Sequence, residues 1–163
     1  MARIRTSTKR KLKRIRKRHV LVSSRKFQNV TSRLFWFDAS IRIGGAGKFH
    51  DEIFERTGLS PNKSHLAGDR VSASSSNVRK EDIWILSSPF KDNEPIDQHL
   101  DWLLHAVAPH VEYLSDVVQN ASWADLCLGC LSDVSYPLIA TGSSATELVK
   151  RLNLELSFNF TCR

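Results

Sequence analysis

The sequence has few cysteines and lacks any long apolar segment. Its three cysteines are odd in number and too few for the disulfide framework of a small secreted domain, so they indicate a reducing compartment. No apolar run approaches the roughly 18 residues that a membrane-spanning helix needs, and the run at residues 19–22 is too short for the core of a signal peptide. We therefore expect a cytoplasmic protein with no membrane partner.

Acidic residues are absent from residues 1–26, although this segment carries 12 of the 24 lysines and arginines. Residues 27–163 therefore hold 12 basic and 17 acidic side chains, so the net charge of +7 describes the N-terminal segment and not the rest of the chain. A dense cationic segment ahead of a mildly acidic body is typical of proteins that contact a polyanion. The composition predicts a basic N-terminal arm and linker, residues 1–33, and a single folded domain, residues 34–163, long enough to bury its own core.

The basic arm predicts phosphate contacts with nucleic acid through residues 3–18, because Lys and Arg neutralise phosphates without reading the base sequence. The side chains expected to make these contacts are Lys9, Arg10, Lys11, Lys13, Arg14, Arg16, Lys17 and Arg18. Two alternatives stay open for the arm. One is a solvated extension with no partner, and the other is an organelle transit peptide, which the thin apolar face makes the weaker interpretation.

Alternating apolar residues predict a strand at each end of the folded domain. In residues 34–43, every second residue from Phe35 to Ile43 is apolar, which is the pattern of a strand with one buried face. Residues 154–161 repeat the pattern, with Phe158 and Phe160 on the expected buried face. Two further apolar segments, residues 82–88 and 123–134, are predicted strands without a polar face.

Helical periodicity and helix-start signals occur between these strands. The predicted helices cover residues 48–57, residues 95–107, a segment after Pro109 and a segment from Ser144 to about Leu152. Gly58 is expected to end the first helix, because glycine is favoured just past a helix C-terminus. Ser144 and Glu147 match a capping box, and residues 58–80 are predicted to be a loop.

The resulting order is strand, helix, strand, two helices, strand, helix, strand. Strands with one polar face favour a sheet that is covered on one side only. We therefore predict an α+β fold, a two-layer sandwich in which a mostly antiparallel four-stranded sheet has helices packed on one face.

The polar face of this sheet is the predicted binding surface for a protein partner. An aromatic side chain surrounded by polar groups is a common anchor in protein interfaces. The candidate partner-binding residues are Trp36, Asp38, Ser40, Arg42, Trp84 and Asn159. The alternative is that the tryptophans are covered by residues 58–80 or by the arm.

Three segments of the domain together resemble a known family. They are the turn Gly58-Leu59-Ser60-Pro61 with the later Gly68-Asp69, the strand Ile83-Trp84-Ile85-Leu86-Ser87-Ser88, and the helix His99-Leu100-Asp101-Trp102-Leu103-Leu104. In order and type they resemble the bacterial family known as domain of unknown function 4279, over roughly residues 34–161. The resemblance implies a small cytoplasmic bacterial protein with no assigned activity, and it supplies no catalytic residues. The basic arm is a departure from the family domain.

A glycine-rich turn at residues 44–48 lies between a strand and a helix, where phosphate-binding loops lie. The turn is short, and Phe49 stands where such a loop has the hydroxyl that binds Mg²⁺. His50 stands where a dinucleotide-binding loop has its third glycine. We therefore interpret the segment as a turn that ends a strand.

The spacings of the cysteines and histidines also do not match a redox, metal or catalytic site. Cys127 and Cys130 form a C-x-x-C motif, but in a strand residues three apart point to opposite faces. His99 and His105 are six residues apart, and the neighbours on a helix face are three or four apart. These spacings favour buried cysteines and partly exposed histidines, with no catalytic residue, no metal and no cofactor.

These observations favour a non-catalytic binding protein whose acidic body recognises a protein partner, of the inhibitor or immunity type by analogy alone. In this hypothesis the basic arm adds contacts to polyanions. The alternative is a nucleic-acid- or ribonucleoprotein-associated protein that acts mainly through the arm. A third class is a metal- or nucleotide-dependent enzyme whose site is assembled across loops. The identity of the partner and the oligomeric state do not follow from the sequence.

Overall fold

The computed structural model describes residues 35–133 and 139–162. The chain divides into Met1–Arg33 and Leu34–Arg163, and every described residue belongs to the second unit. The eight side chains predicted to contact phosphates, Lys9 to Arg18, therefore lie outside the described residues.

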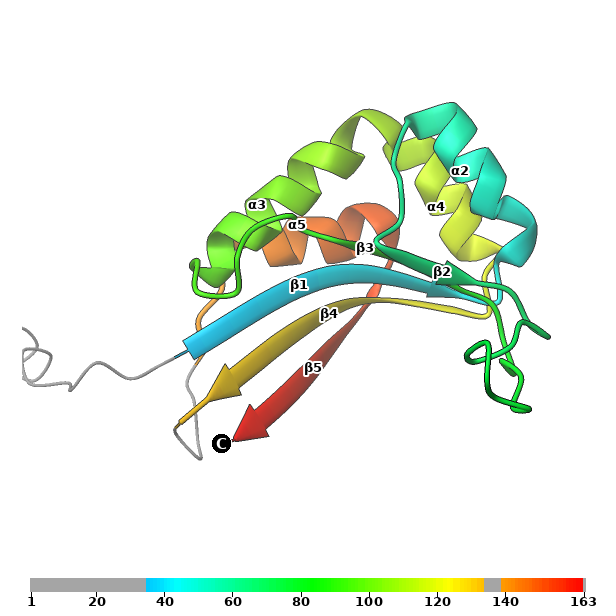
Figure 1. The fold of residues 1–163 in the computed structure, drawn as a ribbon. Helices are drawn as coiled ribbons and strands as arrows, with labels where there is room; N and C mark the ends of the chain where they lie inside the picture. The colour runs from blue at the N-terminus through cyan, green and yellow to red at the C-terminus, as the bar shows by residue number, and fades with distance from the viewer. Residues whose placement is uncertain (1–34, 134–138, 163) are drawn as a thin grey trace, which may run out of the picture. The chain divides into compact units, whose positions relative to one another are not determined.

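The described elements follow the predicted order, with one strand added (Figure 1). They are β1 (Phe35–Gly44), a 3-10 turn (Gly47–Phe49), α2 (His50–Thr57), β2 (Lys63–His65), β3 (Ile83–Ser87), α3 (Ile96–Val107), a second 3-10 turn (Ala108–His110), α4 (Val111–Gln119), β4 (Trp123–Ser132), α5 (Ser143–Leu152) and β5 (Glu155–Cys162). The α+β class predicted from the sequence is confirmed.

The described sheet has five strands in the order β2-β3-β1-β4-β5. The β2–β3, β3–β1 and β1–β4 pairs are antiparallel, whereas β4 and β5 are parallel. The prediction of four strands is wrong because β2 contains only Lys63, Ser64 and His65 within a polar segment, where no alternation marks a strand. The parallel pair arises because α5 carries the chain back to the end of the sheet where β4 begins, as a crossover between parallel strands must.

Specific hydrogen bonds set the C-terminal end of α2 and the N-terminal end of α5. Gly58 adopts a left-handed conformation with φ of 70° after α2, and its N–H donates to the Phe54 carbonyl at 2.8 Å, as predicted. The capping box predicted for α5 is wrong. Ser144 lies inside the helix and donates to the Asp101 carboxylate of α3. The Gly142 N–H at the start of α5 instead donates to Asp97 Oδ1 at 2.7 Å, so α3 supplies the cap.

The hydrophobic core lies between the sheet and the helices, which cover one face of it (Figure 1). Alternate residues of β1 contribute Ala39, Ile41 and Ile43, all at most 2% exposed. They pack in one cluster with buried side chains of α3, including Leu100 and Leu103, which are fully buried. The face of the sheet opposite the helices is called the outer face below.

The strand β5 departs from the predicted burial pattern. Its helix-facing side chains Leu156, Phe158 and Phe160 are 47%, 51% and 52% exposed. The rings of Phe158 and Phe160 stack on each other, with centroids 5.8 Å apart. The two-residue alternation predicts correctly which side chains share a face, but the helices cover β1 and β4 and leave β5 uncovered (Figure 1).

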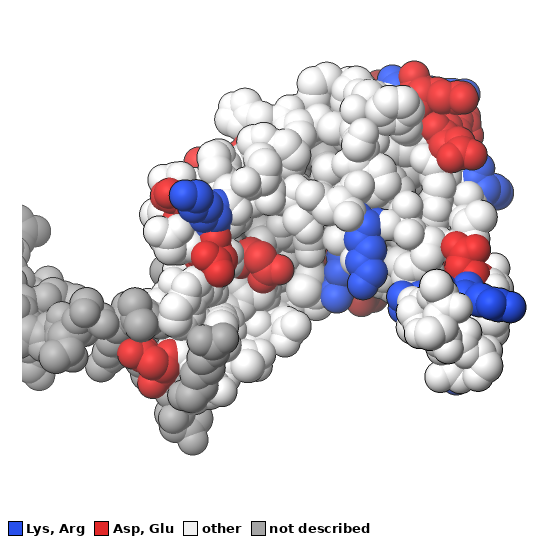
Figure 2. Space-filling model, in the orientation of Figure 1, with Lys and Arg blue, Asp and Glu red and all other residues white. Residues whose placement is uncertain are grey.

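Charges on the described part are unevenly distributed. On the side shown in Figure 2, acidic side chains gather over α2, which carries Asp51, Glu52 and Glu55. Basic side chains on the same side stand in small separate groups. This side of the described unit therefore offers no broad cationic surface for a nucleic acid.

Candidate functional site

The outer face of the sheet is ordered in rows of side chains across β1, β4 and β5. The register of the strands gives the rows Trp36–Leu131–Thr161, Asp38–Gly129–Asn159, Ser40–Cys127–Ser157 and Arg42–Asp125–Glu155. Segments from both ends of the folded domain thus meet on one surface. Five of the six predicted partner-binding residues lie on it, namely Trp36, Asp38, Ser40, Arg42 and Asn159.

Trp84 lies on the opposite face, so its assignment to the binding surface is wrong. Within the sheet Trp84 pairs with Ile43, a core residue, and its side chain is only 1% exposed. The segment from Ile83 to Leu86 is apolar throughout, so the sequence contains no alternation that fixes which side chains face the helices.

Arg42 holds three strands together in the fourth row. Its Nε donates to Asp125 Oδ1 at 2.8 Å, its Nη2 donates to Asp125 Oδ2 at 2.5 Å, and Nη2 also donates to Ser157 Oγ at 3.2 Å. These hydrogen bonds to Asp125, which is 6% exposed, raise the pKa of Arg42. Because this bidentate pair engages its guanidinium, Arg42 stabilises the sheet and is less available to bind a partner.

The third row offers little surface. Ser40 and Cys127 are 6% and 8% exposed, although they lie on the outer face. Ser40 is therefore the least accessible of the five predicted partner-binding residues on this face. Surface for a partner is concentrated in the first two rows.

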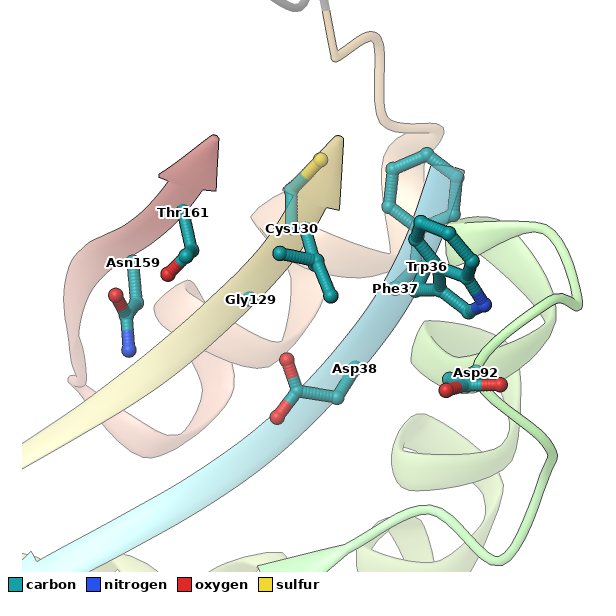
Figure 3. Close-up of a pocket in the computed structure, with 9 residues that line it drawn as sticks. Trp36, Phe37, Asp38, Asp92, Gly129, Cys130, Asn159 and Thr161 are labelled. Atoms are coloured by element: carbon teal, nitrogen blue, oxygen red, sulfur yellow. The ribbon is translucent and has the colours of Figure 1, made fainter. Parts of the chain in front are cut away.

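These two rows form one side of an open hollow of about 430 Å³, at the end of the sheet where β1 begins and β4 and β5 end (Figure 3). The hollow is lined by Trp36, Phe37, Asp38, Asp92, Gly129, Cys130, Leu131, Asn159 and Thr161. In Figure 3, Asp38 lies between Asp92 on one side and Asn159 on the other. We call this feature the Asp38 hollow.

Asp92 reaches the hollow from the segment between β3 and α3. Its carbonyl accepts a hydrogen bond from the Phe37 N–H at 2.6 Å. This contact lies beyond the end of β3, whose pairing with β1 covers residues 40–44 of β1. The segment after β3 therefore continues the pairing with β1 through this bond and through the Ser88 N–H, which donates to the Ala39 carbonyl at 3.3 Å. The bond to Phe37 fixes Asp92 beside Trp36 (Figure 3).

The Asp38 carboxylate can lie against β4 because residue 129 is a glycine. A Cβ at position 129 would stand 1.5 Å from Asp38 Oδ1, far inside any allowed contact. Asp38 and Gly129 are direct neighbours across β1 and β4. A glycine inside a strand often marks such a close approach, so this is a signal in the sequence that our prediction of the site did not use. Nothing in the sequence places Asp92, because loop positions follow no periodicity.

The glycine-rich turn is occupied by a carboxylate of the chain itself. The Gly47 N–H donates to Asp82 Oδ2 at 3.0 Å, and the Ala67 N–H donates to Asp82 Oδ1 at 2.6 Å. These hydrogen bonds, the one from Ala67 first, lower the pKa of Asp82. An anionic side chain at this turn disfavours a phosphate, which agrees with the interpretation of residues 44–48 as a strand-ending turn.

The cysteines behave as their spacing predicts. Cys127 pairs with Ser40 on the outer face and Cys130 with Phe37 on the helix-facing side, so the two thiols point apart. Both are buried and unbridged, and burial raises the pKa of Cys130. They do not form a redox pair.

The histidines differ in part from the prediction. His105 is exposed, but His99 is 1% exposed and its Nδ1 shares a 2.5 Å hydrogen bond with Ser88 Oγ. Ser88 precedes α3, so this bond ties the helix to the end of β3. Within residues 35–133 and 139–162, no group of three or more His, Cys, Asp or Glu side chains is placed to hold a metal ion.

None of the helices in the described part of the chain is long and apolar enough to cross a membrane.

Comparison with other proteins identifies a family over nearly the whole described unit. Neither the comparison with curated proteins nor the comparison with solved structures gives a match. A family model described as "Domain of unknown function (DUF4279)" matches residues 35–162, the residues that form β1 to β5 and the outer face. The chain therefore belongs to the DUF4279 family.

Proposed function

We propose that the chain is a non-catalytic binding protein that recognises a protein partner through the outer face of its sheet. The observation that carries the proposal is the Asp38 hollow, where a half-buried Trp36 lies beside the exposed carboxylates of Asp38 and Asp92. An aromatic group with polar neighbours at an open concave surface is the usual composition of an interface anchor. The proposal extends to a cytoplasmic protein, which the unpaired buried cysteines support.

The surrounding surface supports binding rather than catalysis. The polar side chains in the hollow are carboxylate, amide, hydroxyl, thiol and indole, and the nine described residues that line it include no nucleophile hydrogen-bonded to a base. The hydrogen-bonded Ser88 and His99 lie outside the hollow, and His99 is buried. A hydrolytic or transfer site needs such a pair within hydrogen-bond reach. Arg42 and Asp125 satisfy each other and stabilise the platform on which a partner would lie.

A capture experiment with matched variants tests this proposal. Full-length protein, protein lacking residues 1–26, the Trp36→Ala variant and the Arg151→Met variant are used to capture proteins from an extract of the source organism. We expect one partner that the first two proteins and the Arg151→Met control retain and that Trp36→Ala loses. Its binding is then measured by calorimetry with the purified partner. A partner retained equally by Trp36→Ala would rule out the outer face.

A second function rests on the charge of the arm. Twelve of the 24 basic residues lie in residues 1–26, with no acidic residue among them. We propose that the arm adds contacts to nucleic acid, or in the stronger alternative provides the main activity of the protein. If about six to eight basic residues meet phosphates, the logarithm of the affinity should fall with the logarithm of salt concentration with a slope of about −5 to −7. Binding that survives deletion of residues 1–26 would contradict this role.

A further inference from the structure

We propose that the Asp38 hollow receives an arginine side chain of the protein partner. This inference rests on the proposed function, since it names the chemistry that the outer face recognises. The nine residues that line the hollow include two carboxylates, Asp38 and Asp92, and no lysine, arginine or histidine. A concave surface with one sign of charge attracts the opposite sign.

Of the described basic residues, Arg42 interacts electrostatically with Asp38, but none forms an ion pair with a carboxylate of the hollow. Within residues 35–133 and 139–162, the carboxylates of Asp38 and Asp92 form no salt bridge and no side-chain hydrogen bond. Arg42 lies on the same strand as Asp38, but Asp125 binds its guanidinium through two oxygens. As far as the described residues are concerned, the two carboxylates therefore have room to bind a cation.

The geometry of the hollow favours arginine over lysine. A guanidinium is planar and has five N–H donors, so it binds carboxylates through a fork and stacks on an aromatic ring. Along the sheet Asp38 lies between the other groups, with Asp92 and Trp36 on one side and Asn159 on the other (Figure 3). The two carboxylates and the amide oxygen of Asn159 supply acceptors in several directions, and the indole supplies a ring face. An ammonium ion uses fewer of these groups at once.

The size and openness of the hollow fit a side chain carried by a protein. A volume of about 430 Å³ lies at the lower end of the range of small-molecule sites. The hollow is open rather than enclosed, so a side chain on a protruding loop could enter it. The close approach that Gly129 permits keeps the Asp38 carboxylate against β4, on the wall of the hollow that the sheet forms.

The test uses the full-length protein and short blocked peptides. The probes are acetyl-Gly-Gly-Arg-Gly-Gly-amide and the two peptides in which citrulline or lysine replaces arginine. Citrulline keeps the shape of arginine and removes its charge. Binding is followed by the NMR signal of the Trp36 indole N–H, which is assigned by its loss in Trp36→Phe. We expect saturable binding of the arginine peptide, weaker binding of the lysine peptide and no measurable binding of the citrulline peptide.

Matched variants locate the charge that binds. Asp38→Asn and Asp92→Asn keep the shape of each side chain, and each should weaken the arginine peptide by about threefold to fivefold, the range of an exposed ion pair. Glu155→Gln removes a carboxylate from the same face outside the hollow and should leave the affinity unchanged. Equal binding of arginine and citrulline peptides, or an equal loss in Glu155→Gln, would overturn the inference.

Two further outcomes separate this inference from its premise. If the partner is lost in Trp36→Ala but the arginine peptide does not bind, the inference fails and the proposed function stands. If the Trp36 signal shifts with protein concentration in the absence of peptide, the arginine comes from a second copy of this chain. That outcome would overturn the assignment to a separate partner.

Discussion

The carboxylate of Asp38 on β1 lies against the backbone of Gly129 on β4, where a single added Cβ would stand 1.5 Å from Oδ1. The two residues are direct partners in the sheet register. The absence of a side chain at Gly129 thus determines where the Asp38 carboxylate lies. The stability cost of adding a side chain at position 129 can be measured.

A double-mutant cycle tests the contact between Asp38 and Gly129. We expect Gly129→Ala to lower the free energy of unfolding by about 1–3 kcal/mol, because the new methyl group displaces the carboxylate or shifts the strand. In an Asp38→Ala background the same substitution should cost at least about 1 kcal/mol less, since the clashing group is gone. Urea unfolding followed by tryptophan fluorescence measures both costs. Additive costs would show that the close approach does not exist in solution.

The fold class could be predicted because the sequence pattern is set by burial. The alternation from Phe35 to Ile43 follows from one face of β1 lying on the core, and Ala39, Ile41 and Ile43 are buried as expected. The position of Gly58 follows equally from local chemistry. The three-residue β2 and the parallel pairing of β5 have no such local cause, because strand partners are chosen by the whole sheet.

The candidate site was predictable only in part. The shared parity of Trp36, Asp38, Ser40 and Arg42 within one strand places them on one face, which the register confirms. Parity does not decide how far a side chain is exposed, so buried Ser40 and ion-paired Arg42 resembled accessible Asp38. Asp92 enters the hollow through a loop, and its position depends on a backbone bond to Phe37 that no sequence pattern encodes.

The ion pair between Arg42 and Asp125 should matter more than a surface ion pair of the same type. Arg42→Met leaves the carboxylate of Asp125, which is 6% exposed, without its bidentate partner. Since the arginine itself is partly exposed, we expect a loss of about 2 kcal/mol, below the range for fully buried pairs. The control Arg151→Met removes the exposed pair with Glu147 on α5 and should cost less than about 0.5 kcal/mol. Equal losses in the two variants, measured by urea unfolding, would show that the outer-face pair is as solvated as the helical one.

The stability contributed by Asp82 should depend on pH. Hydrogen bonds from the Ala67 and Gly47 N–H groups favour its ionised form and lower the pKa of Asp82 in the folded protein. A carboxyl group with a lowered folded-state pKa stabilises the fold above its unfolded pKa of about 3.9, and this contribution disappears as the pH falls through the folded-state value. Asp82→Asn should therefore be about 1 kcal/mol less stable than the wild type at pH 7.

The same comparison at low pH tests the direction in which the stability contributed by Asp82 changes with pH. The stability difference between Asp82→Asn and the wild type should shrink as the pH falls below about 4 and disappear once the pH is below the lowered folded-state pKa of Asp82, where both side chains are neutral. Asp116→Asn, an exposed change on α4, serves as the control and should show no comparable trend. A difference that is constant from pH 7 to acidic pH would mean that Asp82 is not held by these backbone donors.

The exposed phenylalanines of β5 should contribute less to stability than the residue beside them in the sheet. Phe158 pairs with Leu128, which is fully buried, whereas Phe158 itself is 51% exposed. Leu128→Ala should cost about 3 kcal/mol, the usual loss for a buried leucine that leaves a cavity. Phe158→Ala should cost about 1.5 kcal/mol or less, because only half of the ring leaves water on folding. Both costs are measured by urea unfolding at several protein concentrations. An equally large loss for the two variants would mean that the helix-facing side of β5 is covered in solution, and a loss for Phe158→Ala that grows with protein concentration would identify a second copy of the chain as the cover.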